Sequence, residues 1–160
     1  MHNGYFLQPY SKSLEMRKLQ NIINQSYKIK DSVLLVLRLV LMYGFFNPAM
    51  IKIKDINSIA GWFESLGIPL PNLNVYLTTG TEVLGIILLA LGLFTRWISI
   101  PLIVIMIVAI ITVHLENGFN AGDNGFEIPL YYILMLLILF TFGAGKYSLD
   151  QFLKLNRNDK

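Results

Sequence analysis

The fold is decided by residues 98–115, which read ISIPLIVIMIVAIITVHL. This stretch contains no Asp, Glu, Lys or Arg, and its length is close to the roughly 20 residues that a helix needs to cross a bilayer core. Similar apolar stretches occupy residues 33–51, 76–94 and 127–143. A soluble domain could bury one such stretch, but four in succession leave no polar face to cover them. The sequence therefore predicts an all-α, integral membrane four-helix bundle.

The overall composition supports this interpretation. The chain has 160 residues, of which 54% are hydrophobic and only 14% are charged. Soluble domains are typically about 45–50% apolar and about 25% charged. The net charge is +3, but the basic residues gather near the two ends, so the charge pattern indicates membrane topology rather than nucleic-acid binding. The chain has no cysteine, which excludes disulfides and thiolate metal sites within it.

Three segments follow from this pattern: a basic segment, a membrane domain and a cytoplasmic tail, at residues 1–32, 33–145 and 146–160. In the basic segment, apolar residues recur at helical spacing: Met16, Leu19, Ile23 and Tyr27. This spacing favours a short amphipathic helix on an anionic membrane surface, and the alternative is an unstructured basic tail. Lys and Arg are frequent at both ends and sparse in the loops other than the 95–97 turn. The positive-inside rule therefore predicts that both termini and this turn are cytoplasmic.

The first outer loop, residues 52–75, is expected to contain an interfacial helix. Apolar residues recur at helical spacing between residues 56 and 66, with Asp55 before them as the cap. Gly67 and two prolines, Pro69 and Pro71, are expected to stop this helix, and Trp62 is expected at headgroup level. Asn47-Pro48 is expected to break the first span.

Two charged residues fall within the predicted spans. Arg38 lies in the inner third of the first span and Glu82 in the outer half of the second. Each would cost roughly 2.5–3.5 kcal/mol if it were unpaired in mid-bilayer. Glu82 is expected to face protein, because Thr78 and Gly85 share its helical face and small residues allow close helix packing. The two charges could form a structural ion pair, although the helix rise separates them by roughly 10 Å.

Further polar residues lie near the predicted outer side. His114 ends the third span, and Glu127 opens the fourth with Tyr131 one turn below it. These groups and Glu82 could converge on one polar pocket. The alternatives are that His114 lies at the water interface and that Glu127 only complements the helix dipole. Asn47 would satisfy backbone groups near Pro48, on the side of the helix opposite Arg38.

A metal or haem site is not favoured. One histidine and two glutamates could form a site for a hard or borderline metal, but no ligand pair occurs at helical spacing within the spans. Only His114 is placed to serve as an axial haem ligand.

Short segments in a fixed order extend this pattern over most of residues 33–150: LVLRLV at 35–40, WFESLGIP at 62–69, TEVLG at 81–85, GLFTR at 92–96, VHLENGF at 113–119, NGFEIPL at 124–130 and GKYSLD at 145–150. This ordered set resembles the DoxX family of small bacterial membrane proteins. The resemblance implies a four-helix bundle in the bacterial cytoplasmic (inner) membrane. It also implies that the family's polar positions correspond to Arg38, Glu82, His114 and Glu127.

The resemblance further implies a subunit of a redox or metal and oxidative-stress system that binds a lipophilic small molecule, such as a quinone. In this hypothesis Glu82 is the buried acid or base, Arg38 is its counter-charge, and His114 with Glu127 forms a gate or proton path. Partners would be the lipid bilayer and a membrane protein or a second copy of the chain. Two alternatives stay open: a small carrier or channel, and a membrane anchor that recruits a soluble partner through the basic segment.

Overall fold

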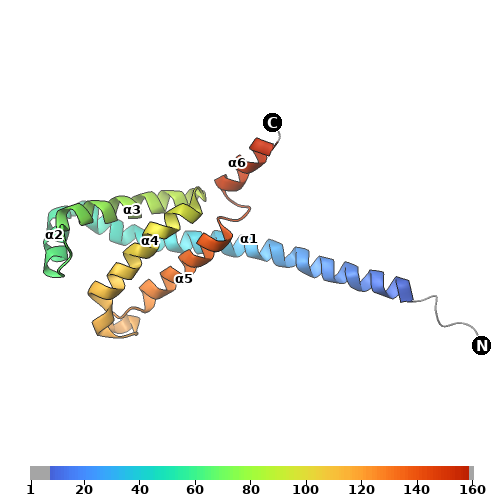
Figure 1. Cartoon of the computed structure of the whole chain (residues 1–160), viewed down its shortest axis with the longest axis horizontal. Coiled ribbons are helices and arrows are strands. Elements are labelled where there is room, and N and C mark those ends of the chain that lie inside the picture. The colour runs from blue at the N-terminus through green and yellow to red at the C-terminus, as the bar shows by residue number, and fades with distance from the viewer. Residues whose placement is uncertain (1–7, 159–160) are drawn as a thin grey trace, which may run out of the picture.

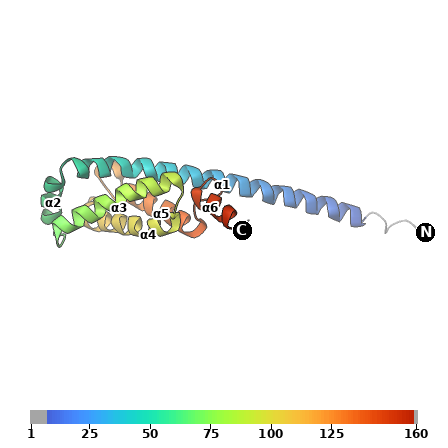
Figure 2. The same ribbon diagram turned by 90° about the horizontal axis from the view of Figure 1, so that it is seen from above.

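The computed structural model describes residues 8–158, with side chains given from residue 15 to 154 except for several positions between 18 and 28. This part of the chain is helical and contains no strand. Four of its helices pack into one bundle, a short helix lies across one end of the bundle, and the last helix lies beyond the opposite end (Figures 1 and 2). In chain order they are α1 Gln8–Lys54, α2 Ile56–Ser65, α3 Pro71–Leu91, α4 Thr95–Ala109, α5 Glu127–Phe142 and α6 Leu149–Asn158.

The first helix, α1, is far longer than the span predicted for it. It has 47 residues and so measures roughly 70 Å, whereas a bilayer core is about 30 Å thick. Its N-terminal half extends beyond the rest of the molecule (Figures 1 and 2). The predicted amphipathic helix is therefore continuous with the first span. The side chains of Leu19 and Tyr27, on which that prediction partly rested, lie outside the described set.

The predicted break at Asn47-Pro48 is wrong, because α1 continues through Pro48 to Lys54. Membrane helices tolerate proline when neighbouring groups compensate for the lost backbone bond. Phe45 and Ala49 on either side of the break signal are fully buried, so packing favours a continuous helix. Asn47 itself is exposed on the surface of α1.

The connection between α1 and α3 contains the predicted helix, α2, but it ends earlier than predicted. Asp55 caps α2 by accepting a hydrogen bond from the Ser58 amide at 3.0 Å, as expected. Gly67, with φ of 73°, turns the chain after α2. Pro71, expected to belong to the loop, instead opens α3 at its first turn, where the missing N–H costs little. The second span therefore begins five residues earlier than residue 76.

The third span is confirmed, with an irregular end. The turn before it is formed by residues 92–94 rather than 95–97, because α4 already begins at Thr95. After Ala109 the helix widens into a π-helical turn, η1 Ile110–His114, and then tightens into η2 Leu115–Asn117. A short helix, η3 Ala121–Asp123, lies in the loop that leads to α5.

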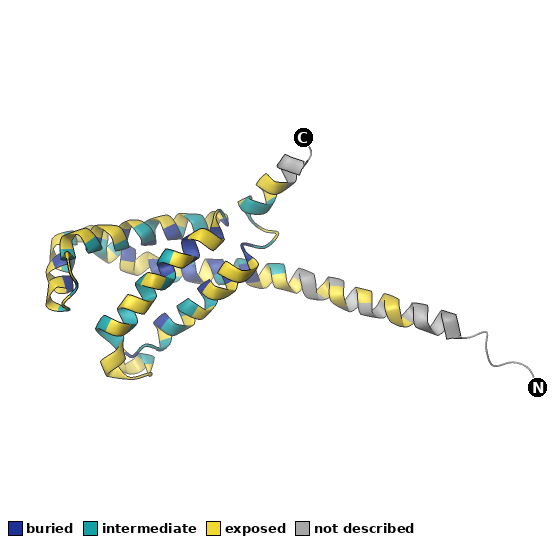
Figure 3. Ribbon diagram, viewed as in Figure 1, coloured by how far each residue is buried: buried dark blue, intermediate teal, exposed yellow. Residues whose placement is uncertain are grey.

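Within residues 8–158, three helical segments are long and apolar enough to cross a membrane: Ile29–Lys54, Pro71–Leu91 and Thr95–Asn117. The fourth, α5, has 16 residues, or roughly 24 Å, which is short for a straight span. Much of the outer surface of the bundle is exposed (Figure 3), and large apolar side chains such as Trp97 and Ile111 point outward. Such a surface suits lipid, so the all-α membrane bundle is confirmed.

The core of the bundle is formed where these helices meet. Buried apolar side chains come from four helices: Leu34, Leu41 and Phe45 of α1, Leu89 of α3, Ile98 and Leu102 of α4, and Leu136 and Leu139 of α5. A smaller cluster of Ala60, Phe63 and Val75 packs α2 against α3. Gly85 of α3 lies directly against Leu102, which is the close helix approach expected on the face of Glu82.

Candidate functional site

Glu82 forms an ion pair with Lys52 inside the bundle. Lys52 Nζ lies 2.9 Å from each carboxylate oxygen of Glu82. The Glu82 side chain is 2% exposed and that of Lys52 is 13% exposed. Lys52 sits in the last turn of α1, where a cation also complements the helix dipole. Glu82 therefore faces protein, as the sequence predicted, but its partner comes from a position assigned to the loop.

The expected pair between Arg38 and Glu82 is wrong. Arg38 is fully buried and donates to the carbonyl oxygen of Leu89 at 3.2 Å and to that of Tyr147. Leu89 lies in the last turn of α3, and its carbonyl oxygen also accepts a hydrogen bond from the Gly92 amide at 3.3 Å. Arg38 therefore has a structural role at the C-terminal end of α3, separate from the Lys52–Glu82 pair.

The segment after α5 completes the surroundings of Arg38. The Asp150 amide donates to the Gly92 carbonyl at 3.2 Å, and its carboxylate accepts from the Phe94 amide at 3.1 Å. These contacts join the start of α6 to the turn between α3 and α4. Arg38 thus connects α1, the end of α3 and the C-terminal segment by hydrogen bonds to backbone groups.

A cavity of about 900 Å³ lies beside the Lys52–Glu82 pair. Cavities that hold small organic ligands typically measure about 300–1,000 Å³. In Figure 1, α3 and α4 meet at the turn that joins them and diverge away from it, and the cavity is lined by residues from both helices. Its wall is largely apolar, with side chains such as Ile100 and Val104 from α4. Its polar lining includes Lys52, Asn74, Thr78, Thr81, Glu82, His114, Asn124 and Tyr132.

The structure brings together only some of the residues predicted for the site. Glu82 and His114 line the same cavity, whereas Arg38, Asn47, Glu127 and Tyr131 do not. His114 Nδ1 lies 2.8 Å from the Asn124 carbonyl oxygen, so the histidine is tied to the loop before α5. The π-helical turn that ends at His114 is a type of irregularity often found at functional sites.

Glu127 braces the same loop from outside the cavity. One of its carboxylate oxygens accepts from the Ala121 amide at 3.0 Å, and the other accepts from the Tyr131 hydroxyl at 2.9 Å. Tyr131 thus contacts Glu127 one helical turn away. The two residues hold the loop whose Asn124 contacts His114.

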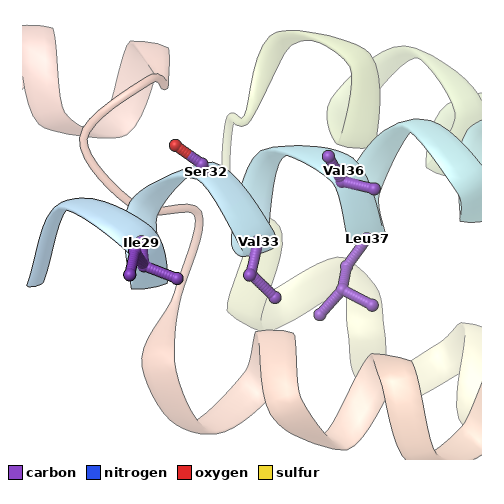
Figure 4. Close-up of a pocket in the computed structure, with 5 residues that line it drawn as sticks. All are labelled: Ile29, Ser32, Val33, Val36 and Leu37. Carbon is purple, nitrogen blue, oxygen red and sulfur yellow. The ribbon is translucent and has the colours of Figure 1, made fainter. Parts of the chain in front are cut away.

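Two cavity residues, Lys52 and Tyr132, were missed by the sequence reasoning. Lys52 lies about four helical turns after Arg38, so the two share a face of α1, and this spacing was the available signal. Tyr132 follows the helical stripe of the buried residues Pro129, Leu136 and Leu139, and its ring packs against Phe45 with centroids 5.6 Å apart. A second hollow, of about 400 Å³, lies on α1 and is lined by Ile29, Ser32, Val33, Val36 and Leu37 (Figure 4). It contains no titratable side chain, so it is a poorer candidate.

Within the described residues, no group of three His, Asp or Glu side chains is arranged to hold a metal ion.

Comparison with known proteins agrees with the fold. A family model described as DoxX matches residues 33–115. An uncharacterised protein of Haemophilus influenzae is 36% identical over 129 residues, which cover 76% of this chain and 83% of that protein. A Bacillus subtilis protein named "Putative oxidoreductase CatD" is 30% identical over 132 residues, which cover 81% of this chain and 91% of the relative. An uncharacterised membrane protein of Mycobacterium tuberculosis is 33% identical over 101 residues, covering 57% of this chain and 62% of the relative. No solved structure matches the chain.

The contacts of Arg38 predict a large effect of Gly92→Ala. Gly92 has φ of 65°, a conformation that costs a non-glycine residue roughly 1–2 kcal/mol. An added Cβ would also overlap Arg38 Nη1 and the Ser148 side chain. We expect the free energy of unfolding to fall by about 2–4 kcal/mol, measured as a lower melting temperature in detergent. The control is Gly80→Ala, also on α3 and with open space around the added carbon. Equal melting temperatures for the two variants would contradict this role of Arg38.

Proposed function

The chain belongs to the DoxX family, and from this premise we propose that it is an accessory membrane subunit of a redox or metal and oxidative-stress system. In this proposal it binds a lipophilic small molecule, such as a quinone, in the cavity beside Lys52 and Glu82.

One observation carries the proposal: a buried ion pair lies in the wall of a largely apolar cavity. Charges inside a membrane protein are costly, and where they occur they commonly mark ligand or proton pathways. A cavity of about 900 Å³ with an apolar wall accommodates the ring and the first part of the tail of a lipophilic molecule. The pair then offers such a molecule a polar contact at one defined place.

The contacts assign a role to each polar group in this proposal. Glu82 is the acid or base that faces the ligand, and Lys52 is its counter-charge in place of Arg38. His114 lies on the cavity wall and forms a proton path between the cavity and its opening. Glu127 and Tyr131 hold the loop that contacts His114. Arg38 and Asn47 take no part in ligand binding.

The redox part of the proposal is supported by the name of the Bacillus subtilis relative, "Putative oxidoreductase CatD". The chain contains no cysteine, so thiol chemistry within it cannot carry electrons. We therefore propose that electrons pass through the bound molecule to a partner protein or a second copy in the membrane.

The proposed ligand is tested by Glu82→Gln, which keeps the shape of the side chain and removes its charge. Mass spectrometry of an organic extract of the purified protein should find a quinone or another lipophilic compound with the native chain and at least about 5-fold less with the variant. Glu64→Gln is the matched control, because Glu64 is exposed on α2 and does not line the cavity. Equal occupancy in all three proteins would contradict the proposal.

A second candidate function is favoured by the length of α1. Its N-terminal half extends beyond the bundle (Figure 2) and carries basic residues, as a docking segment for a soluble partner would. In cells, the anchor function predicts that Glu82→Gln has no effect while deletion of residues 1–28 abolishes function. The ligand function predicts the reverse.

We further propose that the chain lies in the bacterial cytoplasmic membrane with both termini cytoplasmic. The distribution of Lys and Arg supports this orientation, and pairing with Glu82 neutralises Lys52, one of the two lysines on the opposite side. Because the chain has no cysteine, single cysteines report topology directly. In intact spheroplasts, an impermeant maleimide should label Ser65→Cys and Asp123→Cys but not Lys154→Cys until the membrane is opened. If only Lys154→Cys were labelled in intact spheroplasts, the termini would lie outside the cell and the proposed orientation would be wrong.

A further inference from the structure

Tyr132 lines the cavity beside Gly44, and its hydroxyl has no hydrogen-bond partner among the described residues, whereas the neighbouring Tyr131 hydroxyl bonds to Glu127. Tyr132 reaches across from α5 to α1, where its hydroxyl lies against the Cα of Gly44. A Cβ at residue 44 would overlap that hydroxyl, so the glycine provides the space that the hydroxyl occupies. A buried or half-buried tyrosine hydroxyl usually finds a partner. This one is available to a molecule in the cavity.

Lys52 provides a second available donor. Its ammonium group has three N–H bonds, of which two are used by the oxygens of Glu82. Lys52 lines the cavity and keeps 13% of its side chain exposed. The remaining N–H can therefore reach a ligand without breaking the ion pair.

The two donors lie at different heights in the same cavity. Gly44, which marks the Tyr132 hydroxyl, and Lys52 are two turns apart on α1, or roughly 12 Å between their Cα atoms. Side chains on a helix lean toward its N-terminus, which for Lys52 is the direction of Gly44. The distance from the Lys52 ammonium to the Tyr132 hydroxyl is therefore shorter than the distance between the two Cα atoms. Pro48 lies between them on the same face and lines the cavity. The space between the donors is thus apolar and suits one compact ring.

We propose that Tyr132 and Lys52 bind the two oxygens of one ligand, a flat apolar ring that carries a hydrogen-bond acceptor at each of two opposite positions. This inference rests on the proposed lipophilic ligand and adds its binding mode. Tyr132 is then the residue that determines specificity, because it distinguishes such a dioxo ring from an apolar ring of the same size. The remaining apolar wall, from α4 and α5, holds the ring or an attached chain without hydrogen bonds.

The test uses two probes with the same fused-ring skeleton, 1,4-naphthoquinone and naphthalene. Binding is measured by equilibrium dialysis against the full chain in nanodiscs, with empty nanodiscs subtracted. Because the chain has no cysteine, the quinone cannot form thiol adducts with it. The native protein should bind 1,4-naphthoquinone at least about 10-fold more tightly than naphthalene, since each added hydrogen bond contributes a factor of about 3 to 10.

Tyr132→Phe should weaken 1,4-naphthoquinone binding about 3- to 10-fold and leave naphthalene binding unchanged. Unchanged naphthalene binding also shows that the variant has folded. Tyr43→Phe is the matched control, because Tyr43 is exposed on α1 and does not line the cavity, and it should change neither probe. Gly44→Ala should act like Tyr132→Phe on the quinone, because it displaces the hydroxyl.

The outcomes separate this inference from the proposed function. If both probes bind equally and Tyr132→Phe has no effect, the binding mode is wrong while the lipophilic cavity stands. If neither probe binds above the empty nanodiscs, the proposed ligand function itself fails and this inference fails with it.

Discussion

Lys52 and Glu82 place a cation and an anion between α1 and α3, two helices whose buried contact is largely apolar. Removing either partner of a buried pair typically costs about 3–5 kcal/mol, because the other charge is left without compensation. The pair therefore fixes the end of α1 against α3. Arg38 fixes the other end of α3 by donating to the Leu89 carbonyl and to the Tyr147 carbonyl in the segment after α5. The cavity lies beside this helix pair, so its charged wall is held by the same contacts that hold the fold.

The opposite wall is built differently. There α4 and α5 pack against each other. His114 is placed at the cavity by the irregular turns after Ala109 and by the loop before α5, and no contact joins it directly to Glu82 among the described residues. Charge is thus confined to the side of α1 and α3. A molecule in the cavity would meet an ion pair on one side and, on the other, mainly apolar groups together with a few polar side chains such as those of His114 and Tyr132. This asymmetry is what a lipophilic ring with polar substituents requires.

The parts of the structure that depend on local sequence could be predicted. The apolar stretches set the spans, and Asp55 marked the start of α2 because a helix cap is read within one turn. Pro48 and Pro71 misled the prediction, since packing overrode one helix-breaking signal and the other residue began a helix instead of ending one. The partners of Arg38 are backbone carbonyl groups. Because every residue has one, no sequence pattern predicts which of them Arg38 binds. Lys52 was interpreted as a loop charge because topology rules count lysines without their partners.

The central claim is that Lys52 and Glu82 act as one buried unit. A double-mutant cycle with Lys52→Met and Glu82→Met, measured as free energies of unfolding in detergent, tests it most directly. Each single variant should lose about 3 kcal/mol, and the double variant should lose at least about 2 kcal/mol less than the two losses added together, because no uncompensated charge remains. Losses that simply add would show that the two side chains do not interact in the folded protein, and would contradict the account.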